Sequence, residues 1–476
     1  MLKKLKQYLM GNCVATIINI LSLPFILKLI EPRYYGIYSI FMIFYNLFSS
    51  IISVGLEYSF MRYYYEEENK ELLAKNILFI IFKIELFVVI IYILLEKYTN
   101  IFLIKYDFDV KIQYLMFIGI FFVILNRIVM AHIKIEKKAK LFSVLLVLAQ
   151  ILNIISIFFI YYIINEKKYN LIISLVSSNI FVTLLAIFLE KDFWKKVFLS
   201  KGKYTIKTKK LLLYSFPLLL SSILILGYQS IDRLMLEKFK LLEEVGIYTI
   251  AMKFANILNL FQQSFNSIWI PSVLEYYQKN QKIKICKLNN LFTFGISEII
   301  SCILIISPMV KIFLPIEYYL VIKIFPFLMI VPMIGILSEI IGVGIILSEN
   351  TKYQTFISII TLILNVFLNI FFIKKYGLMG AILSTVICYL IYYLLKFYYS
   401  QKKYNIPFNF YKSFFSIIIV LISICINYII IDYWGKIFVF IFISIIILPI
   451  LHKESVILLY RLIMINLKIK KGRLYR

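Results

Sequence analysis

The chain has 476 residues, of which 62% are hydrophobic and only 16% are charged. Apolar runs of about 18 to 25 residues recur along its whole length, which is too much apolar surface for a soluble core and enough to cross a bilayer repeatedly. The net charge of +27 does not indicate nucleic acid, because basic residues collect in the cytoplasmic loops of multi-pass membrane proteins. Alternation with a period of two is weak, which argues against a β-barrel. The composition therefore predicts an all-α polytopic membrane protein.

Fourteen segments are apolar and long enough to span a bilayer, and the loops between them are short. The N-terminal segment MLKKLKQYLMGN leads into the first span without a small-residue cleavage site, so we expect a retained helix and not a signal peptide. The predicted spans are residues 8–29, 36–60, 77–95, 112–131, 141–164, 171–189, 210–231, 245–270, 288–310, 324–347, 354–373, 378–397, 412–431 and 436–451.

Basic residues are distributed unevenly between the two sets of loops. With both termini on one side, the segments on that side carry 34 Lys and Arg, and the opposite loops carry 15. The other three, Lys83, Arg127 and Lys253, lie inside spans. Because the more positive side of such a protein is cytoplasmic, we expect both termini in the cytoplasm. The charged C-terminal stretch ESVILLYRLIMINLKIKKGR predicts a short helix on the inner membrane surface.

The sequence carries no recognisable motif for catalysis or metal binding. Its two histidines, His132 and His452, are far apart, and no nucleophile–base pair, Gly-rich phosphate loop or Walker motif is present. The five cysteines are scattered and odd in number, with no metal-ligand spacing or disulfide framework. We therefore expect a protein that is not an enzyme and that uses no metal or organic cofactor. Coupling to H⁺ or Na⁺ stays open.

One sequence string is repeated at a distance of 210 residues. Residues 35–46 read YGIYSIFMIFYN, and residues 245–256 read VGIYTIAMKFAN. Seven of these twelve pairs are identical, including Gly36 and Gly246, where about one identity would arise by chance. Only the second copy carries a lysine, Lys253. The pattern indicates an internal duplication.

A second match fixes the size of the repeat. The strings ILN and IFFI within 151–160 recur within 363–373 at nearly the same offset. The repeat covers six spans, and an even number places both copies in the same orientation, so we expect two six-helix lobes related by a pseudo-two-fold axis along the membrane normal. The predicted parts are an N-lobe at 1–190, a basic cytoplasmic linker at 191–209, a C-lobe at 210–400, and two extra helices with a basic tail at 401–476.

Polar residues form stripes along two of the predicted spans. Because lipid penalises such faces, we expect them to point into the protein. The alternative is that they serve as hydrogen-bonding contacts between helices, which is common in membrane bundles. The first-span stripe includes Asn12 and Asn19, and the eighth-span stripe comprises Lys253, Asn256, Asn259, Gln263 and Asn266.

Several charged residues lie within or near spans. Lys253 and Glu298 are the hardest to explain without a function, because a charge inside the membrane is costly. Arg127, Arg62, Asp232 and Arg233 lie near span ends, where their side chains can reach the membrane surface instead. Glu298 and Glu339 are candidates for ion coupling, since a buried carboxyl group can carry a proton.

The chain resembles the Wzx-type oligosaccharide flippases over the first twelve spans. These belong to the superfamily that also holds the MATE drug antiporters and MurJ-type lipid II flippases. The pieces that carry the resemblance are GLEYSFMRYY at 55–64, FPLLLSSI at 216–223, SIDRLML at 230–236, VGIYTIAMKFAN at 245–256, EYYLVIKIFPFLMI at 317–330 and LNVFLNIFFIKKYGLMGAILSTVICYL at 364–390.

The resemblance implies a flippase in the bacterial cytoplasmic membrane that turns an undecaprenyl-diphosphate-linked oligosaccharide to the outer leaflet, for O-antigen, capsule or another surface polysaccharide. Implied partners are this lipid-linked substrate, the bilayer, a polysaccharide polymerase and other export components. On this hypothesis Lys253 is the principal cation for the diphosphate, joined by Arg127 and Arg62. The polar lining comprises Asn256, Asn259, Gln263, Asn12 and Asn19, and the motif or gating positions are Asp232, Arg233, Gly36 and Gly246.

Two other functions fit parts of the sequence. A MATE-like drug or cation antiporter would share the two-lobed repeat, but it would favour acidic residues in its membrane interior, and here cations prevail. A membrane polysaccharide polymerase or ligase would share the hydropathy, but such enzymes typically carry a large external loop, and the predicted outer loops here are about 20 residues or shorter.

Overall fold

The computed structural model describes residues 2–95, 107–201, 207–259, 281–348, 352–403, 409–429 and 443–457, together with residues 262, 269, 273, 276, 279 and 440. Within these residues the regular structure is helical and no strand occurs. Contacts divide the chain into two compact units, Met1–Thr249 and Ile250–Arg476, and each unit is described by itself below.

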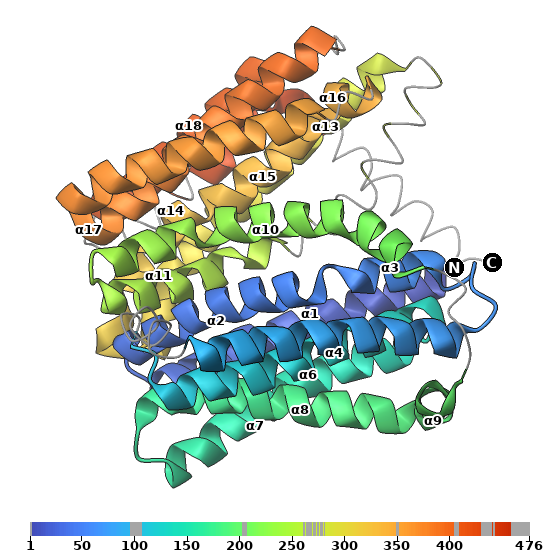
Figure 1. The fold of residues 1–476 in the computed structure, drawn as a ribbon. Helices are drawn as coiled ribbons and strands as arrows, with labels where there is room; N and C mark the ends of the chain where they lie inside the picture. Colours follow the sequence, from blue (N-terminus) through green and yellow to red (C-terminus); the bar gives the residue numbers. More distant parts are fainter. Residues whose placement is uncertain are drawn as a thin grey trace, which may run out of the picture. The chain divides into compact units, whose positions relative to one another are not determined.

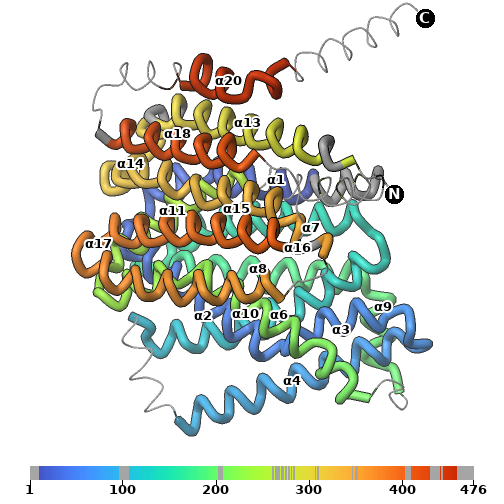
Figure 2. Tube along the Cα trace, turned by 90° about the horizontal axis from the view of Figure 1, so that it is seen from above, coloured from blue at the N-terminus to red at the C-terminus, as the bar shows by residue number. Residues whose placement is uncertain are grey.

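Unit 1 is a bundle of long helices with one short helix across its end (Figures 1 and 2). The first long helix packs along α7, and α8 packs against both α6 and α7. The helices are α1 (Leu2–Leu27), α2 (Pro32–Ser53), α3 (Leu56–Tyr63), α4 (Lys70–Leu94), α6 (Val110–Ile135), α7 (Ala139–Ile163), the 3₁₀ turn Lys167–Tyr169, α8 (Asn170–Leu189), α9 (Lys191–Leu199), α10 (Thr208–Lys238) and the first part of α11 (Leu242–Ala255).

Unit 2 is a second helical bundle, in which α15 packs against α17, and α13 against α18. The long element α17 is two helices, because Gly377 has φ 54° and ψ −131° and reverses the chain there. Glycine adopts a positive φ without a steric penalty. The elements are α13 (Lys282–Ile306), the 3₁₀ segments Ser307–Phe313 and Ile316–Tyr318, α14 (Tyr319–Leu328), α15 (Ile330–Ile341), α16 (Val343–Leu347), α17 (Lys352–Lys403), α18 (Phe410–Ile429), the π segment Ile443–Ile447 and α20 (Leu448–Leu451).

The division between the units does not fall in the predicted linker at 191–209. It falls after α10 and inside α11, because α10 packs on α2 and α3 and so belongs with the helices that precede it. The predicted N-lobe and C-lobe boundaries stay predictions.

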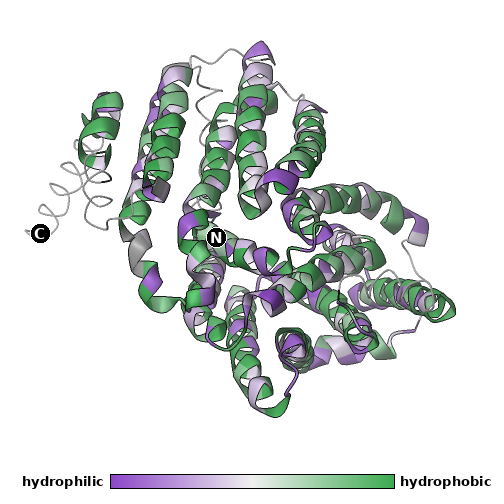
Figure 3. Ribbon diagram, turned by 90° about the vertical axis from the view of Figure 1, so that its left-hand side faces the viewer, coloured by the Kyte–Doolittle hydropathy of each residue, from purple (hydrophilic) through white to green (hydrophobic). Residues whose placement is uncertain are grey.

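The structure confirms an all-α polytopic membrane protein. Eleven helices of the described part are long and apolar enough to cross a membrane, and one of them, α17, covers two predicted spans. Twelve of the fourteen predicted spans are thereby accounted for. The spans predicted at 245–270 and 436–451 lie partly outside the described residues, so the count of fourteen stays a prediction. Figure 3 shows apolar residues along most of each helix, as contact with lipid requires.

The span predicted at 36–60 is interrupted, so a single continuous helix there was the wrong expectation. Val54 and Gly55 both have positive φ, 50° and 67°, and they separate α2 from α3. A β-branched residue in this conformation is an outlier that only strong surrounding contacts maintain. Here Gly55 lies against α10, since a Cβ on Gly55 would lie 3.2 Å from the carbonyl oxygen of Ser215.

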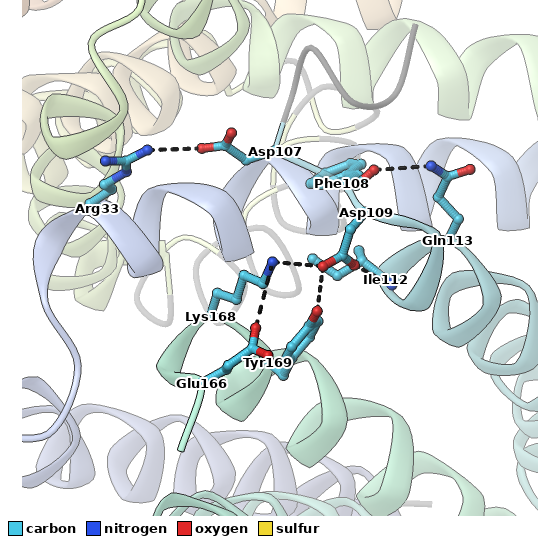
Figure 4. A network of polar contacts seen from close by, with 9 residues as sticks. All are labelled: Arg33, Asp107, Phe108, Asp109, Ile112, Gln113, Glu166, Lys168 and Tyr169. Atoms are coloured by element: carbon cyan, nitrogen blue, oxygen red, sulfur yellow. Dashed lines mark hydrogen bonds and ion pairs between the residues drawn. The ribbon is translucent and has the colours of Figure 1, made fainter. Parts of the chain in front are cut away.

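Polar contacts at one end of unit 1 join three loops that were predicted to lie outside the membrane (Figure 4). Arg33 pairs with Asp107 at 3.3 Å, and Lys168 pairs with Asp109 at 2.6 Å. Tyr169 also donates to Asp109. Arg33 lies in the first turn of α2, the two aspartates lie between α4 and α6, and Lys168 and Tyr169 lie between α7 and α8. They therefore lie at the same end of the bundle, as the predicted topology requires.

Contacts at the opposite end join the loops that were predicted to be cytoplasmic. Lys138, which precedes α7, pairs with Glu190 at the start of α9 at 2.5 Å. Tyr64 donates to Glu136 at 2.8 Å, and Lys75 donates to the carbonyl of Ser200 at 2.7 Å. The contacts named here thus each join loops of the same predicted side.

We expect the outer network to make the stability of the protein sensitive to acid. Burial alone would raise the pKa of Asp109, but the hydrogen bonds from Lys168, Tyr169 and the Ile112 amide outweigh it and hold the pKa below its ordinary value. A lowered carboxyl pKa adds stability above the ordinary carboxyl range near pH 4, and this stability is lost as the pH falls through the lowered pKa. Thermal unfolding of the detergent-solubilised protein between about pH 6 and pH 3 should show it.

The matched comparison is Asp109→Asn, with Asp192→Asn on the exposed side of α9 as the control. The Asp109 variant should unfold at a lower temperature than the wild type near pH 6, and the difference should narrow toward pH 3. The control should track the wild type at every pH. Equal pH profiles for all three proteins would show that the Asp109 contacts add nothing to stability.

Candidate functional site

Unit 1 contains a cavity of about 550 Å³ on the side of the predicted cytoplasmic loops. Five helices line it. Its polar lining residues combine amides, hydroxyls, a carboxylate and two cations, and charged residues are rare within membrane-spanning segments. The lining residues are Asn46 and Ser50 of α2, Glu57, Tyr58 and Met61 of α3, Asn126, Arg127, Met130, Ala131 and Lys134 of α6, Phe142 and Leu146 of α7, and Ser222, Ile225 and Leu226 of α10.

Arg127 is the central cation of this cavity. Its guanidinium donates to the Ser49 hydroxyl at 2.9 Å and lies 3.9 Å from a carboxylate oxygen of Glu57. The side chain is 27% exposed, so it is neither buried in a tight ion pair nor released into solvent. The loose distance to Glu57 leaves donor groups of the guanidinium available for an anion, and this planar group suits a phosphate.

The break at Val54–Gly55 gives α3 its own direction. Three residues of this short helix, including Glu57, line the cavity, and their helix begins directly at the break. Lys134, about two helical turns beyond Arg127 on α6, adds a second cation, with its ammonium 4.8 Å from the centre of the Phe142 ring. The cavity is therefore cationic on its α6 wall.

Arg62 behaves differently from Arg127. Its side chain is 51% exposed and pairs at 2.5 Å with Glu66, one turn along the chain. It is not among the residues that line the cavity of unit 1. An exposed i, i+4 pair of this kind explains Arg62 without any ligand.

One residue of the predicted polar stripe of the first span, Asn19, makes a contact between helices. Asn19 donates from its side-chain amide to Gln150 of α7 at 3.3 Å. The backbone carbonyl of Asn12 accepts a hydrogen bond from the Thr16 hydroxyl at 2.9 Å. Both asparagines are half-buried, and α1 packs against α7 along its length. For Asn19, the hydrogen-bonding alternative thus has direct support.

The repeated glycines meet each other where α2 and α11 cross. A Cβ on Gly36 would collide with the carbonyl oxygen of Leu242 and lie 3.3 Å from the Gly246 nitrogen. A Cβ on Gly246 would collide with the carbonyl oxygen of Pro32 and lie 3.1 Å from the Gly36 nitrogen. Because Pro32 and Leu242 are also 210 residues apart, the contact is reciprocal. This is the contact pattern that the predicted two-fold relation of the repeat would produce at its centre.

A third equivalent pair extends this crossing. The Thr249 hydroxyl donates to the Ser39 hydroxyl at 2.8 Å, and these two residues are again 210 positions apart. Arg233 of α10 also donates to Ser39, at 3.2 Å. The adjacent Asp232 accepts a hydrogen bond from Tyr248 at 2.6 Å. All four predicted motif positions therefore lie at or next to the α2–α11 crossing.

In unit 2 the structure describes part of the second predicted stripe. Lys253 is half-buried on α11. Asn259 donates to the side chain of Asn256 at 2.9 Å, which confirms that these two residues share a face. Gln263 and Asn266 lie outside the described residues. The role of Lys253 toward a substrate stays a prediction.

The two candidate coupling carboxylates have different surroundings. Glu339 of α15 pairs with Lys396 of α17 at 3.1 Å, and Lys396 also donates to Tyr392 at 3.3 Å. The Lys396 side chain is 3% exposed. Glu298 of α13 is half-buried, and its Oε1 atom is buried with no hydrogen-bond partner among the described residues. Glu339 thus has a cationic partner, whereas one carboxylate oxygen of Glu298 is buried without a partner in the described part of the chain.

Comparison with known proteins decides the family. The family described as polysaccharide biosynthesis protein matches residues 1–277, which is more than half of the chain. This chain is a member of that family. The capsular polysaccharide biosynthesis protein CapF of Staphylococcus aureus is 26% identical over 266 residues, which cover 53% of this chain and 65% of that relative. The matched region thus spans less than two thirds of CapF.

Solved structures with the same fold include two kinds of transporter. A lipid II flippase, MurJ, in an inward closed conformation has a TM-score of 0.70 at 16% identity, covering 96% of this chain and 99% of that chain. An inward-facing multidrug resistance MATE family transporter of the MOP superfamily has a TM-score of 0.59 at 15% identity, covering 83% and 94%. The TM-scores establish a shared fold, and at these low identities they show the fold alone. The family and fold expected from the short sequence motifs are therefore confirmed.

Two buried or cavity-lining lysines of this chain are not among the site residues predicted from the sequence. Lys134 and Lys396 each lie at the predicted inner end of a span, where a lysine is ordinary because it can reach the membrane surface. The structure instead places Lys134 in the wall of the cavity and buries Lys396 against Glu339. One signal was available for Lys396, since Glu339 needed a cationic partner inside the membrane.

Proposed function

We propose that this chain is a flippase, not an enzyme, that moves an undecaprenyl-diphosphate-linked oligosaccharide across the bacterial cytoplasmic membrane during surface polysaccharide synthesis. The observation that carries the proposal is the cavity in unit 1, where Arg127 and Lys134 lie beside Asn46, Asn126 and Ser50. A diphosphate needs cations to replace its hydration at this depth, and sugars need amides and hydroxyls. Membership of the polysaccharide biosynthesis protein family supports the same substrate class.

The headgroup would cross by alternating access while the polyprenyl tail stays in the lipid. Both termini would lie in the cytoplasm, in keeping with the charge bias and with the two sets of loop contacts at opposite ends of unit 1. Lys253 would be the principal cation of the second half, and Asn256 and Asn259 would contact sugar. Gly36 and Gly246 contact each other through equivalent backbone positions, and in this proposal the two halves would pivot about that contact.

Ion coupling, if the cycle uses it, is better assigned to Glu298 than to Glu339. A coupling carboxylate must gain and lose a cation during the cycle. Glu339 already has Lys396 as its counter-ion at 3.1 Å. Glu298 has one buried carboxylate oxygen with no hydrogen-bond partner in the described part of the chain. A polymerase and other export components would receive the product on the outer side.

The function can be tested in cells that lack this gene and make a defined surface glycan. Restoring the gene should restore surface glycan, and without it the lipid-linked repeat unit should accumulate on the inner leaflet. Resistance to cationic drugs should not change. Restored drug resistance without restored glycan would identify a drug antiporter instead. Purified protein that lengthens glycan on its own would identify a polymerase.

A further inference from the structure

A second hollow in unit 1 lies between α4, α6 and α9, apart from the cavity that holds Arg127. It has a volume of about 270 Å³, and its walls are almost entirely apolar. Two of the wall residues, Phe79 and Phe82 of α4, are 49% and 51% exposed, so the groove opens outward to the surroundings of the bundle. For a membrane protein those surroundings are lipid.

The groove runs from one membrane surface toward the bilayer centre. On α4 it extends from Lys75, near the start of the helix, to Phe82, which is a rise of about 10 Å at 1.5 Å per residue. On α6 it reaches Phe121, near the middle of that helix. One leaflet contributes about 15 Å of hydrocarbon. The groove therefore has the direction and depth of a single acyl chain from the leaflet beside α9.

The short helix α9 closes the surface end of the groove. It is amphipathic, with Trp194 and Val197 buried, Phe198 66% exposed, and Lys195 and Lys196 on its exposed side. Figure 1 draws it across the direction of α8, as a helix at a membrane surface would lie. Lys75 of α4 fixes its C-terminal end by donating to the carbonyls of Phe198 and Ser200 at 3.1 and 2.7 Å.

A lysine within a membrane-spanning helix, Lys83, lies next to the same groove. Lys83 lies in the middle of α4, and its side chain is exposed toward lipid, where a charge is costly. Its ammonium lies 4.3 Å from the centre of the Phe79 ring, a wall residue of the groove. Side chains on a helix point back toward its N-terminus, and the N-terminus of α4 is at the α9 end. Lys83 thus reaches toward the surface where Lys195 and Lys196 lie.

We propose that this groove is a binding site for an anionic phospholipid of the leaflet beside α9, which is the inner leaflet in the predicted orientation. One acyl chain fills the apolar groove, and the lysines of α9 together with Lys83 attract the headgroup. The charge favours an anionic lipid over a zwitterionic one by about fivefold for each nearby lysine. The depth favours an acyl chain over an undecaprenyl chain, which is several times longer than one leaflet is thick.

Native mass spectrometry of the purified full-length protein, titrated with phosphatidylglycerol, tests the site. Leu125→Trp places a large ring in the groove, and Leu184→Trp on the lipid-facing side of α8 is its matched control. Lys83→Gln removes one cation, and Lys140→Gln at the same predicted membrane surface is its control. Lys83→Gln should weaken phosphatidylglycerol binding about fivefold, since 1 kcal/mol corresponds to that ratio. Leu125→Trp should abolish the bound lipid, and both controls should bind as the wild type does.

A second measurement needs no variant. Phosphatidylglycerol with a photoreactive group in its acyl chain should label the wild type within 75–82 and 121–125. Equal binding of phosphatidylcholine, or displacement by an equimolar amount of undecaprenyl phosphate, would overturn the proposal. So would labelling that avoids both segments. These outcomes do not depend on transport, so they leave the proposed function untouched.

Discussion

Replacing Arg127 by alanine should lower surface glycan export about 10- to 100-fold at equal protein level. The estimate follows from the loss of charge-assisted hydrogen bonds to a desolvated phosphate, which are worth about 1.5–3 kcal/mol. Arg127→Lys should retain part of the activity, because it keeps the charge but loses the planar donor pair. The measurement is surface glycan per unit of membrane protein, together with the lipid-linked repeat unit that remains on the inner leaflet.

Arg62 provides the matched control for this prediction. It is also an arginine next to the membrane, but it is 51% exposed and already paired with Glu66. Arg62→Ala should change export by less than about fivefold, because an exposed pair contributes at most about 1 kcal/mol. Equal losses in the two variants would remove the special role of Arg127.

A purely structural role for Arg127 has its own test. Glu57→Gln removes the neighbouring charge at 3.9 Å and leaves the guanidinium in place. If Arg127 serves substrate, Glu57→Gln should retain much more export than Arg127→Ala. If the two variants lose export and thermal stability together, Arg127 only supports the packing of α2, α3 and α6.

Alanine at Gly36 should destabilise the protein by about 3 kcal/mol, the upper part of the range for an overpacked contact. The added methyl group would collide with the backbone carbonyl of Leu242, so two helices must separate, and no side chain can rotate to relieve the clash. Gly246→Ala should cost about the same, because it meets the equivalent carbonyl of Pro32. Thermal unfolding in detergent and the amount of folded protein in membranes measure the effect.

The double variant gives a sharper result than either single one. Once the helices have separated for one methyl group, the second has room, so the two costs should not add. Gly227→Ala on α10 is the control, since no heavy atom lies within 4 Å of its added Cβ. This control should be neutral or slightly stabilising, because alanine favours a helix over glycine by up to about 1 kcal/mol. Additive losses at Gly36 and Gly246 would show that they are not one contact.

The sequence predicted the fold well because the membrane imposes a rule that can be read locally. Every span must be long, apolar and helical, and the loop charges identify the sides. The repeat of 35–46 at 245–256 also located a contact, because its shared glycines lie against each other in the structure. That relation was visible in the sequence as identity, although its geometric meaning was not.

The site was predictable only in part, because hydropathy does not show whether a polar side chain on a helix lines a cavity, contacts another helix or lies on the surface. Arg127 and Arg62 look alike in the sequence, yet one lines a cavity and the other pairs on the surface. The break at Val54–Gly55 was read as part of one span, since a valine in the left-handed conformation is not a local preference. Asn19 was grouped with the lining, and the structure gives it Gln150 as a partner.

The close contact between α2 and α11 also limits which substitutions the two copies of the repeat can accept. A side chain added at either glycine would collide with the backbone of the other repeat copy, so Gly36 and Gly246 are mutually constrained. One turn beyond Ser39 and Thr249, the equivalent positions are Ile43 and Lys253, and there the copies differ in charge. The predicted duplication thus keeps one close contact between equivalent positions while neighbouring positions differ, which recognition of a substrate without symmetry would require.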